Sequence, residues 1–215
     1  MKKVKNDMIL SLDLIDILKS YELCEAIYDY IDTIKIGYPL TLSEGLKSIG
    51  ILKENFDFTV ICDYKLADIP ATNEKIAKLS YEKGADYLIV HGFLGSDSVK
   101  ACLDVASQHN KDIFLLSEMS HPGSSMFLKS ASENIIRMGL DLGIKNYVAP
   151  SNKIERLSGI RRLVGDDSFI ISPGVGTQGG DPKETLKYAD ALIVGRSIYE
   201  ASDPETAIIN IIKSL

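Results

Sequence analysis

The stretch Phe58-Thr59-Val60-Ile61-Cys62-Asp63-Tyr64 is an apolar run with β-branched residues that ends at a carboxylate. Such a run predicts a strand buried on both faces of a parallel sheet. Similar runs recur along the chain, separated by amphipathic stretches of helical length, and together they predict an α/β fold, the (β/α)8 or TIM barrel. The other predicted strands are Met8 to Asp13, Thr33 to Gly37, Tyr87 to His91, Ile113 to Ser117, Asn146 to Ala149, Phe169 to Ser172 and Ala191 to Val194.

Start and stop signals flank the predicted helices between these strands. They are Ser43 before Glu44 and Pro182 after Asp181 at helix starts, and Gly84, Gly143 and Gly165 after helix ends. A parallel barrel can use a chain of this length without a second domain. We therefore expect residues 1–215 to form one domain.

The composition excludes several classes of protein. With 45% hydrophobic and 25% charged residues, the chain is typical of a soluble globular protein. A net charge of −6 argues against binding to nucleic acid, which needs a basic face. Asp13 and Asp16 interrupt the apolar stretch from Met8 to Leu18, which is too short to span a membrane and a poor export signal.

Cys24, Cys62 and Cys102 are far apart and lie in apolar segments. This pattern suggests neither a disulfide framework nor a zinc site, and it favours buried free thiols. We therefore expect a cytoplasmic protein that binds neither a membrane nor nucleic acid.

Two short segments about half the chain apart resemble each other. Ala85-Asp86-Tyr87-Leu88-Ile89-Val90 is similar to Ala189-Asp190-Ala191-Leu192-Ile193-Val194. One interpretation places the fourth and eighth strands at equivalent positions of two half-barrels. Chance similarity between two strands rich in valine and isoleucine is the alternative.

Charged residues stand at the ends of the first three predicted strands, where the mouth of a barrel gathers its functional groups. They form a row of alternating sign: Asp13, Lys35, Asp63 and Lys65. Asp63 and Lys65 are two apart on an extended strand, so both side chains should point the same way, with Cα atoms about 6.5 Å apart. The row predicts an active site, and a purely structural ion-pair network is the alternative.

Two glycine-containing segments follow the last two predicted strands. They are Ser172 to Gly180 and Gly195-Arg196-Ser197. Glycine lets backbone N–H groups approach an oxyanion, and arginine supplies a fork of charged donors. Loops after the seventh and eighth strands bind phosphate in many barrels, so the pair predicts a phosphorylated small molecule as ligand. A glycine-rich turn beside a surface arginine is the alternative.

The segment Asp63-Tyr64-Lys65-Leu66-Ala67-Asp68-Ile69 matches the Asp-x-Lys-x-x-Asp-Ile signature of orotidine 5'-monophosphate decarboxylases. Other segments that resemble this family, in the expected order, are Thr33 to Leu40, Glu118 to Gly123, Ser172 to Gly176 and Val194 to Ser197. The resemblance is closest to the short, archaeal type. It implies a carboxy-lyase that converts orotidine 5'-monophosphate to UMP, the last step of de novo pyrimidine biosynthesis, with no cofactor and no metal.

The resemblance also implies residue roles. Lys65 would protonate the C6 carbanion, Asp63 would lie beside the departing carboxylate, and Lys35 and Asp68 would hold the charge array in place. Substrate contacts are implied for Asp13, Lys35 and Asp63, for Ser120 at the pyrimidine edge, for Gln178 between base and phosphate, and for Pro173, Gly195 and Arg196 in the phosphate segments. Asp68 and Thr72 would reach the ribose in the neighbouring subunit's site, which implies a homodimer.

Three other functions compete with this interpretation. Sister enzymes that share the Asp-x-Lys-x-x-Asp signature use Mg²⁺, and their second strand carries an acidic metal ligand. By this resemblance the corresponding residue in this chain is Lys35, which removes a ligand and adds a positive charge. A nucleotide-binding regulator without catalysis would not need the charged row. A phosphosugar isomerase would need an acid/base pair across the mouth and explains the row less well.

The histidines are not expected to act in chemistry. His91 is interpreted as a satisfied barrel histidine, His109 as an exposed residue at a helix end, and His121 as a residue that shapes its loop.

Overall fold

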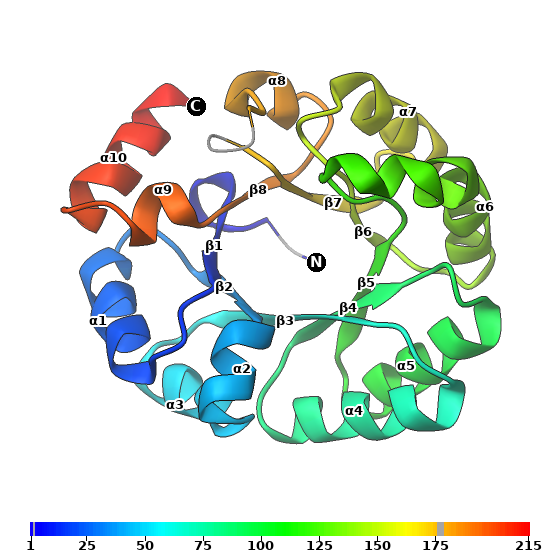
Figure 1. The fold of residues 1–215 in the computed structure, drawn as a ribbon, viewed down its shortest axis with the longest axis horizontal. Helices are drawn as coiled ribbons and strands as arrows, with labels where there is room; N and C mark the ends of the chain where they lie inside the picture. The colour runs from blue at the N-terminus through cyan, green and yellow to red at the C-terminus, as the bar shows by residue number, and fades with distance from the viewer. Residues whose placement is uncertain (2, 176–178) are drawn as a thin grey trace.

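Eight parallel strands close into a barrel with helices around the outside (Figure 1). The structure, a computed structural model, describes residues 1, 3–175 and 179–215. Neighbouring strands pair in chain order, and β8 pairs with β1. The predicted (β/α)8 barrel is therefore confirmed. The strands are β1 (Met8–Leu12), β2 (Thr33–Gly37), β3 (Thr59–Leu66), β4 (Tyr87–His91), β5 (Asp112–Leu116), β6 (Asn146–Val148), β7 (Phe169–Pro173) and β8 (Ala191–Val194).

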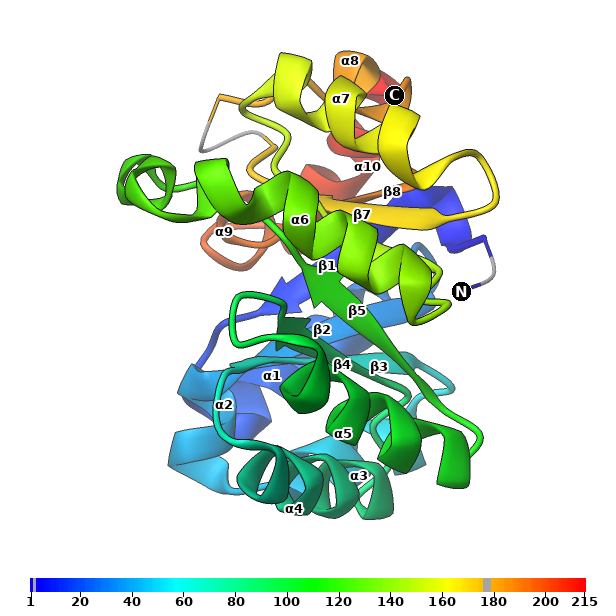
Figure 2. The ribbon, with the colours of Figure 1, turned by 90° about the vertical axis from the view of Figure 1, so that its right-hand side faces the viewer.

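Helices connect consecutive strands and cover the outer face of the barrel. Figure 2, a side view, shows the segment before α6 projecting beyond the barrel at the end toward which the strands run. The α-helices in the described residues are α1 (Ile17–Ile27), α2 (Tyr38–Glu44), α3 (Lys47–Asn55), α4 (Pro70–Glu82), α5 (Ser96–Gln108), α6 (Leu128–Asp141), α7 (Ile154–Val164), α8 (Pro182–Leu186), α9 (Arg196–Tyr199) and α10 (Pro204–Ser214). Short 3-10 turns are η1 (Lys5–Asp7) and η2 (Pro122–Met126).

The apolar core has two layers, as expected for strands buried on both faces. One layer fills the barrel interior, and the other lies between the strands and the surrounding helices. Buried interior residues include Ile9, Ile61, Ile89, Phe114 and Ile171. The interior is a packed core, so a ligand can enter only at its ends.

All eight predicted strands are present, but several ends differ. β1 ends at Leu12, β5 begins and ends one residue earlier than predicted, β6 ends at Val148 and β7 ends at Pro173. β3 is Thr59–Leu66, two residues longer at its end. The cause is a register shift against β4 between Cys62 and Leu66, which lets pairing resume beyond the charged residues.

One predicted helix start is wrong. Ser43 and Glu44 end α2, and Gly45, with φ 76°, closes that helix. Ser43 Oγ donates to the carbonyl of Ile15 on another segment, so its hydroxyl caps no helix. The other signals are confirmed. Asp181 accepts from the N–H of Glu184 where α8 begins, and positive φ angles occur at Gly84, Gly143 and Gly165.

The two similar segments make the same contact in each half of the barrel. Asp86 accepts from the N–H of Val60 at 2.9 Å, and Asp190 accepts from the N–H of Ile170 at 2.7 Å. Each aspartate therefore ties the start of its own strand to the strand before it. Each carboxylate also pairs with a cation from the helix that precedes this earlier strand, Lys53 and Arg161. The repeated contact supports the interpretation of two equivalent half-barrels.

Candidate active site

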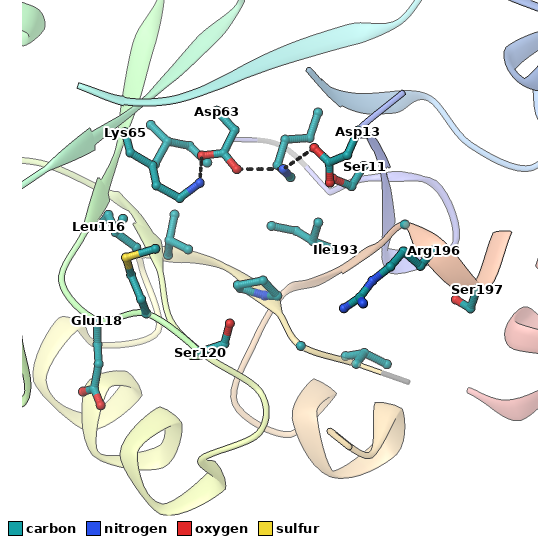
Figure 3. Close-up of a pocket in the computed structure, with 18 of the residues that line it drawn as sticks. Ser11, Asp13, Asp63, Lys65, Leu116, Glu118, Ser120, Ile193, Arg196 and Ser197 are labelled. Carbon is teal, nitrogen blue, oxygen red and sulfur yellow. Dashed lines mark hydrogen bonds and ion pairs between the residues drawn. The ribbon is translucent and has the colours of Figure 1, made fainter. Parts of the chain in front are cut away.

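A row of charged side chains crosses the carboxyl ends of β1, β2 and β3 (Figure 3). Asp63 Oδ2 accepts from Lys35 Nζ at 2.7 Å, and Asp63 Oδ1 accepts from Lys65 Nζ at 2.8 Å. Lys35 Nζ also lies 3.9 Å from Asp13 Oδ1. Lys35 is 6% exposed and Asp63 8%, so the centre of the row is buried. One carboxylate thus pairs with two ammonium groups inside the barrel mouth.

Strand register explains why these side chains meet. Asp63 is paired with Gly37 across β2 and β3. A Cβ atom on Gly37 would lie 2.9 Å from Asp13 Oδ1, closer than such atoms pack. Glycine at this position therefore leaves room for the first acid of the row beside the second strand.

The backbone at Lys65 is not the regular extended strand that the sequence predicted. Lys65 has φ 45°, in the left-handed region, and it lies within the register shift between Cys62 and Leu66. Asp63 and Lys65 do meet as predicted, but the bulge brings them together rather than plain alternation. A non-glycine residue in this region is strained by about 1 kcal/mol, and such strain often accompanies functional sites.

The ionisation of the pair follows from its contacts. Burial alone would raise the pKa of Asp63, but Lys35 and Lys65 more than offset it, and the pKa is lowered from its ordinary value. Burial alone would lower the pKa of Lys35, but Asp63 and then Asp13 more than offset it, and that pKa is raised. Both groups are therefore charged at neutral pH.

His91, at the end of β4, lies near the row but does not line the cavity described below. It is 8% exposed and packs against the ring of Phe93, and its Nδ1 has no hydrogen-bond partner among the described residues. Burial, followed by repulsion from Lys65, lowers the pKa of His91 to about 4. His91 is therefore buried, as the sequence indicated. The expectation that its ring nitrogens are fully hydrogen-bonded is wrong, because Nδ1 has no partner among the described residues.

A cavity of about 230 Å³ opens between the charged row and the loops after β7 and β8. Figure 3 shows Arg196 on the far side of this cavity from Asp63 and Lys65. Gly195 precedes it, and a Cβ there would lie 3.1 Å from Ser11 Cβ, so glycine permits close packing of the β8 loop on β1.

The cavity has an apolar wall that the sequence analysis did not single out. Four residues from four different strands contribute to it: Ile89, Leu116, Val148 and Ile193. Each belongs to the packed layer inside the barrel. The sequence carried no separate signal for them, because apolar residues in buried strands look like ordinary core. A ligand group beside Lys65 would therefore meet charge on one side and hydrocarbon on the other.

Glu118 lines the cavity, is 1% exposed, and was not predicted as a site residue. Its Oε2 accepts from Arg156 Nε at 3.0 Å and Nη2 at 2.8 Å, and its Oε1 lies 3.6 Å from Lys153 Nζ. Asn152 donates to the carbonyl of Ser120 at 3.0 Å. The loop after β6 and the start of α7 therefore hold the loop that carries Ser120.

Most of the predicted site residues lie around this one cavity: Asp13, Lys35, Asp63, Lys65, Ser120, Pro173, Gly195 and Arg196. Asp68 and Thr72 do not line it, because the chain turns away from the mouth after β3. Asp68 is exposed, and its carboxylate accepts from the N–H of Ile69 at 2.7 Å. Gln178 lies outside the described residues.

Fold and cavity together define a (β/α)8 barrel with a charged, half-apolar site at the carboxyl ends of its strands. Residues 6–211 match the model of the orotidine 5'-phosphate decarboxylase / HUMPS family. The chain belongs to this family.

Similar proteins cover nearly the whole chain. A protein named orotidine 5'-phosphate decarboxylase from Methanosphaera stadtmanae is 58% identical over 212 residues, 99% of this chain and 98% of that protein. One of the same name from Methanosarcina acetivorans is 46% identical over 93% of this chain and 90% of that protein. A crystal structure of orotidine 5'-monophosphate decarboxylase from Methanocaldococcus jannaschii, complexed with the inhibitor BMP, matches with a TM-score of 0.93 and 41% identity over 100% of this chain and 99% of that chain.

Within residues 1, 3–175 and 179–215, no helix is both long enough and apolar enough to cross a membrane.

Proposed function

We propose that this protein converts orotidine 5'-monophosphate to UMP without a cofactor or a metal, the last step of de novo pyrimidine biosynthesis. The observation that carries the proposal is that the ammonium groups of Lys35 and Lys65 both bind the carboxylate of Asp63. Lys65 lies beside an apolar wall of the cavity, and Arg196 lines the same cavity. The similar proteins named above bear this activity in their names. The proposal takes residues 1–215 as one catalytic domain that works in the cytoplasm.

In the proposed reaction the bond between C6 and the carboxylate carbon breaks, CO₂ leaves, and the electron pair stays on C6. Lys65 then transfers a proton from Nζ to C6 and is left as a neutral amine that solvent can protonate again. The ring cannot delocalise the charge at C6, so the protein must stabilise it electrostatically. Lys65 Nζ is held by Asp63 at 2.8 Å, and an ammonium fixed before the reaction begins stabilises developing charge without reorganisation.

Repulsion between Asp63 and the substrate carboxylate is a smaller contribution in this proposal. Two like charges about 4 Å apart contribute roughly 4 kcal/mol at an effective dielectric of about 20. Enzymes as a class lower barriers by about 8 to 23 kcal/mol. Stabilisation of the carbanion by Lys65, together with binding energy from the remote phosphate, therefore carries most of the rate enhancement.

The rest of the cavity provides the proposed substrate contacts. Asp13 and Lys35 would bind the ribose hydroxyls, and Ser120 would hydrogen-bond the pyrimidine edge. Arg196, with Gly195 before it, would hold the phosphate. Pro173 lines the same cavity, and Gln178 is proposed to bridge base and phosphate.

Asp68 and Thr72 are proposed to act in the site of a second copy of the chain. Both lie away from the cavity of their own chain, which agrees with this assignment. Large apolar side chains are exposed on the segments that follow β1 to β4, as a subunit interface requires. These residues are Ile15, Leu18, Tyr38, Leu42, Ile69, Phe93 and Leu94. We therefore propose a homodimer formed through this half of the barrel mouth.

The test is the ultraviolet absorbance of orotidine 5'-monophosphate mixed with purified protein in excess EDTA, with Lys65→Ala as control. Conversion to UMP in EDTA that the substitution abolishes is the expected result. Activity on a keto-sugar phosphate that depends on Mg²⁺, without conversion of the nucleotide in EDTA, would move the protein to the sister group. The ammonium of Lys35, paired to Asp63 at 2.7 Å, argues against a cation at that position.

A further inference from the structure

A buried hydrogen-bond relay lies directly beneath the exposed segment that carries Asp68. Asn73 on α4 is 0% exposed and donates from Nδ2 to Ser98 Oγ at 2.7 Å. Ser98 on α5 is 2% exposed and donates from Oγ to the main-chain carbonyl of Asp68, also at 2.7 Å. The relay therefore runs from the interior of the α4–α5 pair to the backbone of one surface residue.

The direction of the relay is fixed by chemistry. A serine hydroxyl has one proton, and Ser98 gives it to the Asp68 carbonyl, so Asn73 must supply the donor to Ser98. Asn73 Oδ1 is then left buried with no partner among the described residues. An unpaired buried oxygen costs about 1 to 3 kcal/mol, so the relay is a poor way to stabilise the contact between two helices.

The segment above the relay is otherwise held by short local bonds. Asp68 Oδ1 accepts from the N–H of Ile69 at 2.7 Å, and the carbonyl of Ile69 accepts from Thr72 at 3.0 Å. These bonds set the shape of the turn before α4, but they do not tie it to the rest of the protein. The relay supplies that connection to α5, and it ends at the residue proposed to act in the neighbouring site.

We propose that Asn73 and Ser98 are positioning residues that orient Asp68 and Thr72 for catalysis in the neighbouring subunit. The inference rests on the proposed function. It adds that the relay in one subunit sets the position of the residues that this subunit contributes to its partner's site. Asn73 and Ser98 touch no substrate. They act through the backbone of Asp68, so their loss impairs the site of the partner and leaves their own site intact.

The first variant replaces the relay by hydrocarbon. Asn73→Leu combined with Ser98→Ala removes both buried polar side chains, including the unpaired Oδ1 of Asn73, and leaves the carbonyl of Asp68 on an exposed residue that water can reach. The thermal unfolding midpoint should stay at or above that of the unmodified protein, while kcat/KM falls about 10-fold because the donated acid is no longer held in register. Ser98→Thr, which keeps the hydroxyl, should restore activity in the presence of Asn73.

A matched control lies on the same helix. Ser80 is 0% exposed and its hydroxyl donates to the carbonyl of Ile76, within α4, at 2.7 Å. Ser80→Ala removes a buried hydroxyl of the same kind without touching the relay. It should leave kcat/KM unchanged, and activity in the double relay variant equal to that of Ser80→Ala would overturn the inference.

Mixed dimers distinguish action in the partner's site from action in the same chain. The relay variant and Lys65→Ala are co-expressed with different affinity tags, and dimers carrying both tags are isolated. In such a dimer, the site that keeps Lys65 receives Asp68 from the chain with an intact relay. Its specific activity should be about half that of the unmodified dimer, since one of two sites is complete. If the relay acted within its own chain, the specific activity would instead be about one-twentieth of that of the unmodified dimer. Only one of the two sites would then be active, and it would be weakened about 10-fold.

A second mixed dimer, Lys65→Ala with Asp68→Ala, separates the two levels of the argument. If this second dimer regains about half of the activity of the unmodified dimer, but the dimer of the relay variant with Lys65→Ala does not, then the relay inference is wrong and the shared site stands. If it regains none, the shared site itself is wrong and the inference falls with it.

Discussion

Replacing Asp63 by asparagine should destabilise the protein strongly, because its carboxylate is paired with both Lys35 and Lys65. The contacts are 2.7 and 2.8 Å, and at an effective dielectric of about 20 each pair contributes about 6 kcal/mol before desolvation is subtracted. Removal of one partner from a buried ion pair costs about 3 to 5 kcal/mol in practice. We expect about 3 kcal/mol here, since Asp13 remains 3.9 Å from Lys35 and can neutralise part of its charge.

The assay is urea unfolding at pH 7 and fixed protein concentration, since assembly would make stability depend on concentration. Asp104→Asn is the matched control, because its pair with Lys100, at 2.6 Å, has side chains more than half exposed. That control should lose less than about 1 kcal/mol. Adding Lys35→Met to Asp63→Asn should restore more than half of the loss, since no unpaired ammonium then stays buried.

A loss in Asp63→Asn no larger than in Asp104→Asn would refute this reasoning. The pH dependence gives a second check. Because the folded pKa of Asp63 lies below its ordinary value of 3.8, its contribution to stability is complete above that pH and is lost as the pH falls through the folded pKa. Because the folded pKa of Lys35 is raised above 10.5, its contribution is complete below that pH and is lost as the pH rises through the folded pKa.

Three further predictions concern other parts of the molecule. Arg196→Ala should raise KM for the nucleotide by about 100-fold but leave KM for the nucleoside orotidine unchanged, and an equal rise for both in steady-state kinetics would contradict a phosphate contact. His91 titrates at about 4 when folded, so the unfolding free energy should fall between pH 6.5 and 4 more steeply in the unmodified protein than in His91→Asn, as urea titrations can show. A Cβ on Gly139 would lie 2.5 Å from Leu115 Cδ2, whereas nothing lies within 4 Å of one on Gly159. Gly139→Ala should therefore lower the free energy of unfolding by about 1 to 3 kcal/mol, and Gly159→Ala should raise it by about 0.5 to 1 kcal/mol. Equal shifts of the thermal unfolding midpoint in the two variants would argue against the packing explanation.

The sequence predicted the barrel and the charged row for a simple physical reason. Strands in a parallel barrel pair in chain order, so residues at the ends of consecutive strands become neighbours. Asp13, Lys35 and Asp63 could therefore be placed together without coordinates. The same rule put Arg196 at the mouth, just after the strand that closes against the first.

Other features of the site depend on three-dimensional packing that no local pattern shows. Glu118 resembles an ordinary charged loop residue until Arg156, far along the chain, is seen to neutralise it. Ser43 has the composition of a helix cap but bonds a distant carbonyl. Asp68 is close to Lys65 in sequence yet lies away from the cavity, because the chain turns away from the mouth after β3.

The left-handed backbone at Lys65 sets stability against activity. Glycine adopts φ 45° with less strain than lysine, so the backbone conformation alone would favour glycine there. A directed-evolution experiment that selects only for heat resistance should therefore accept substitutions at this position that a screen for turnover rejects. That outcome would show that the proposed chemistry, and not the backbone conformation, keeps lysine at position 65.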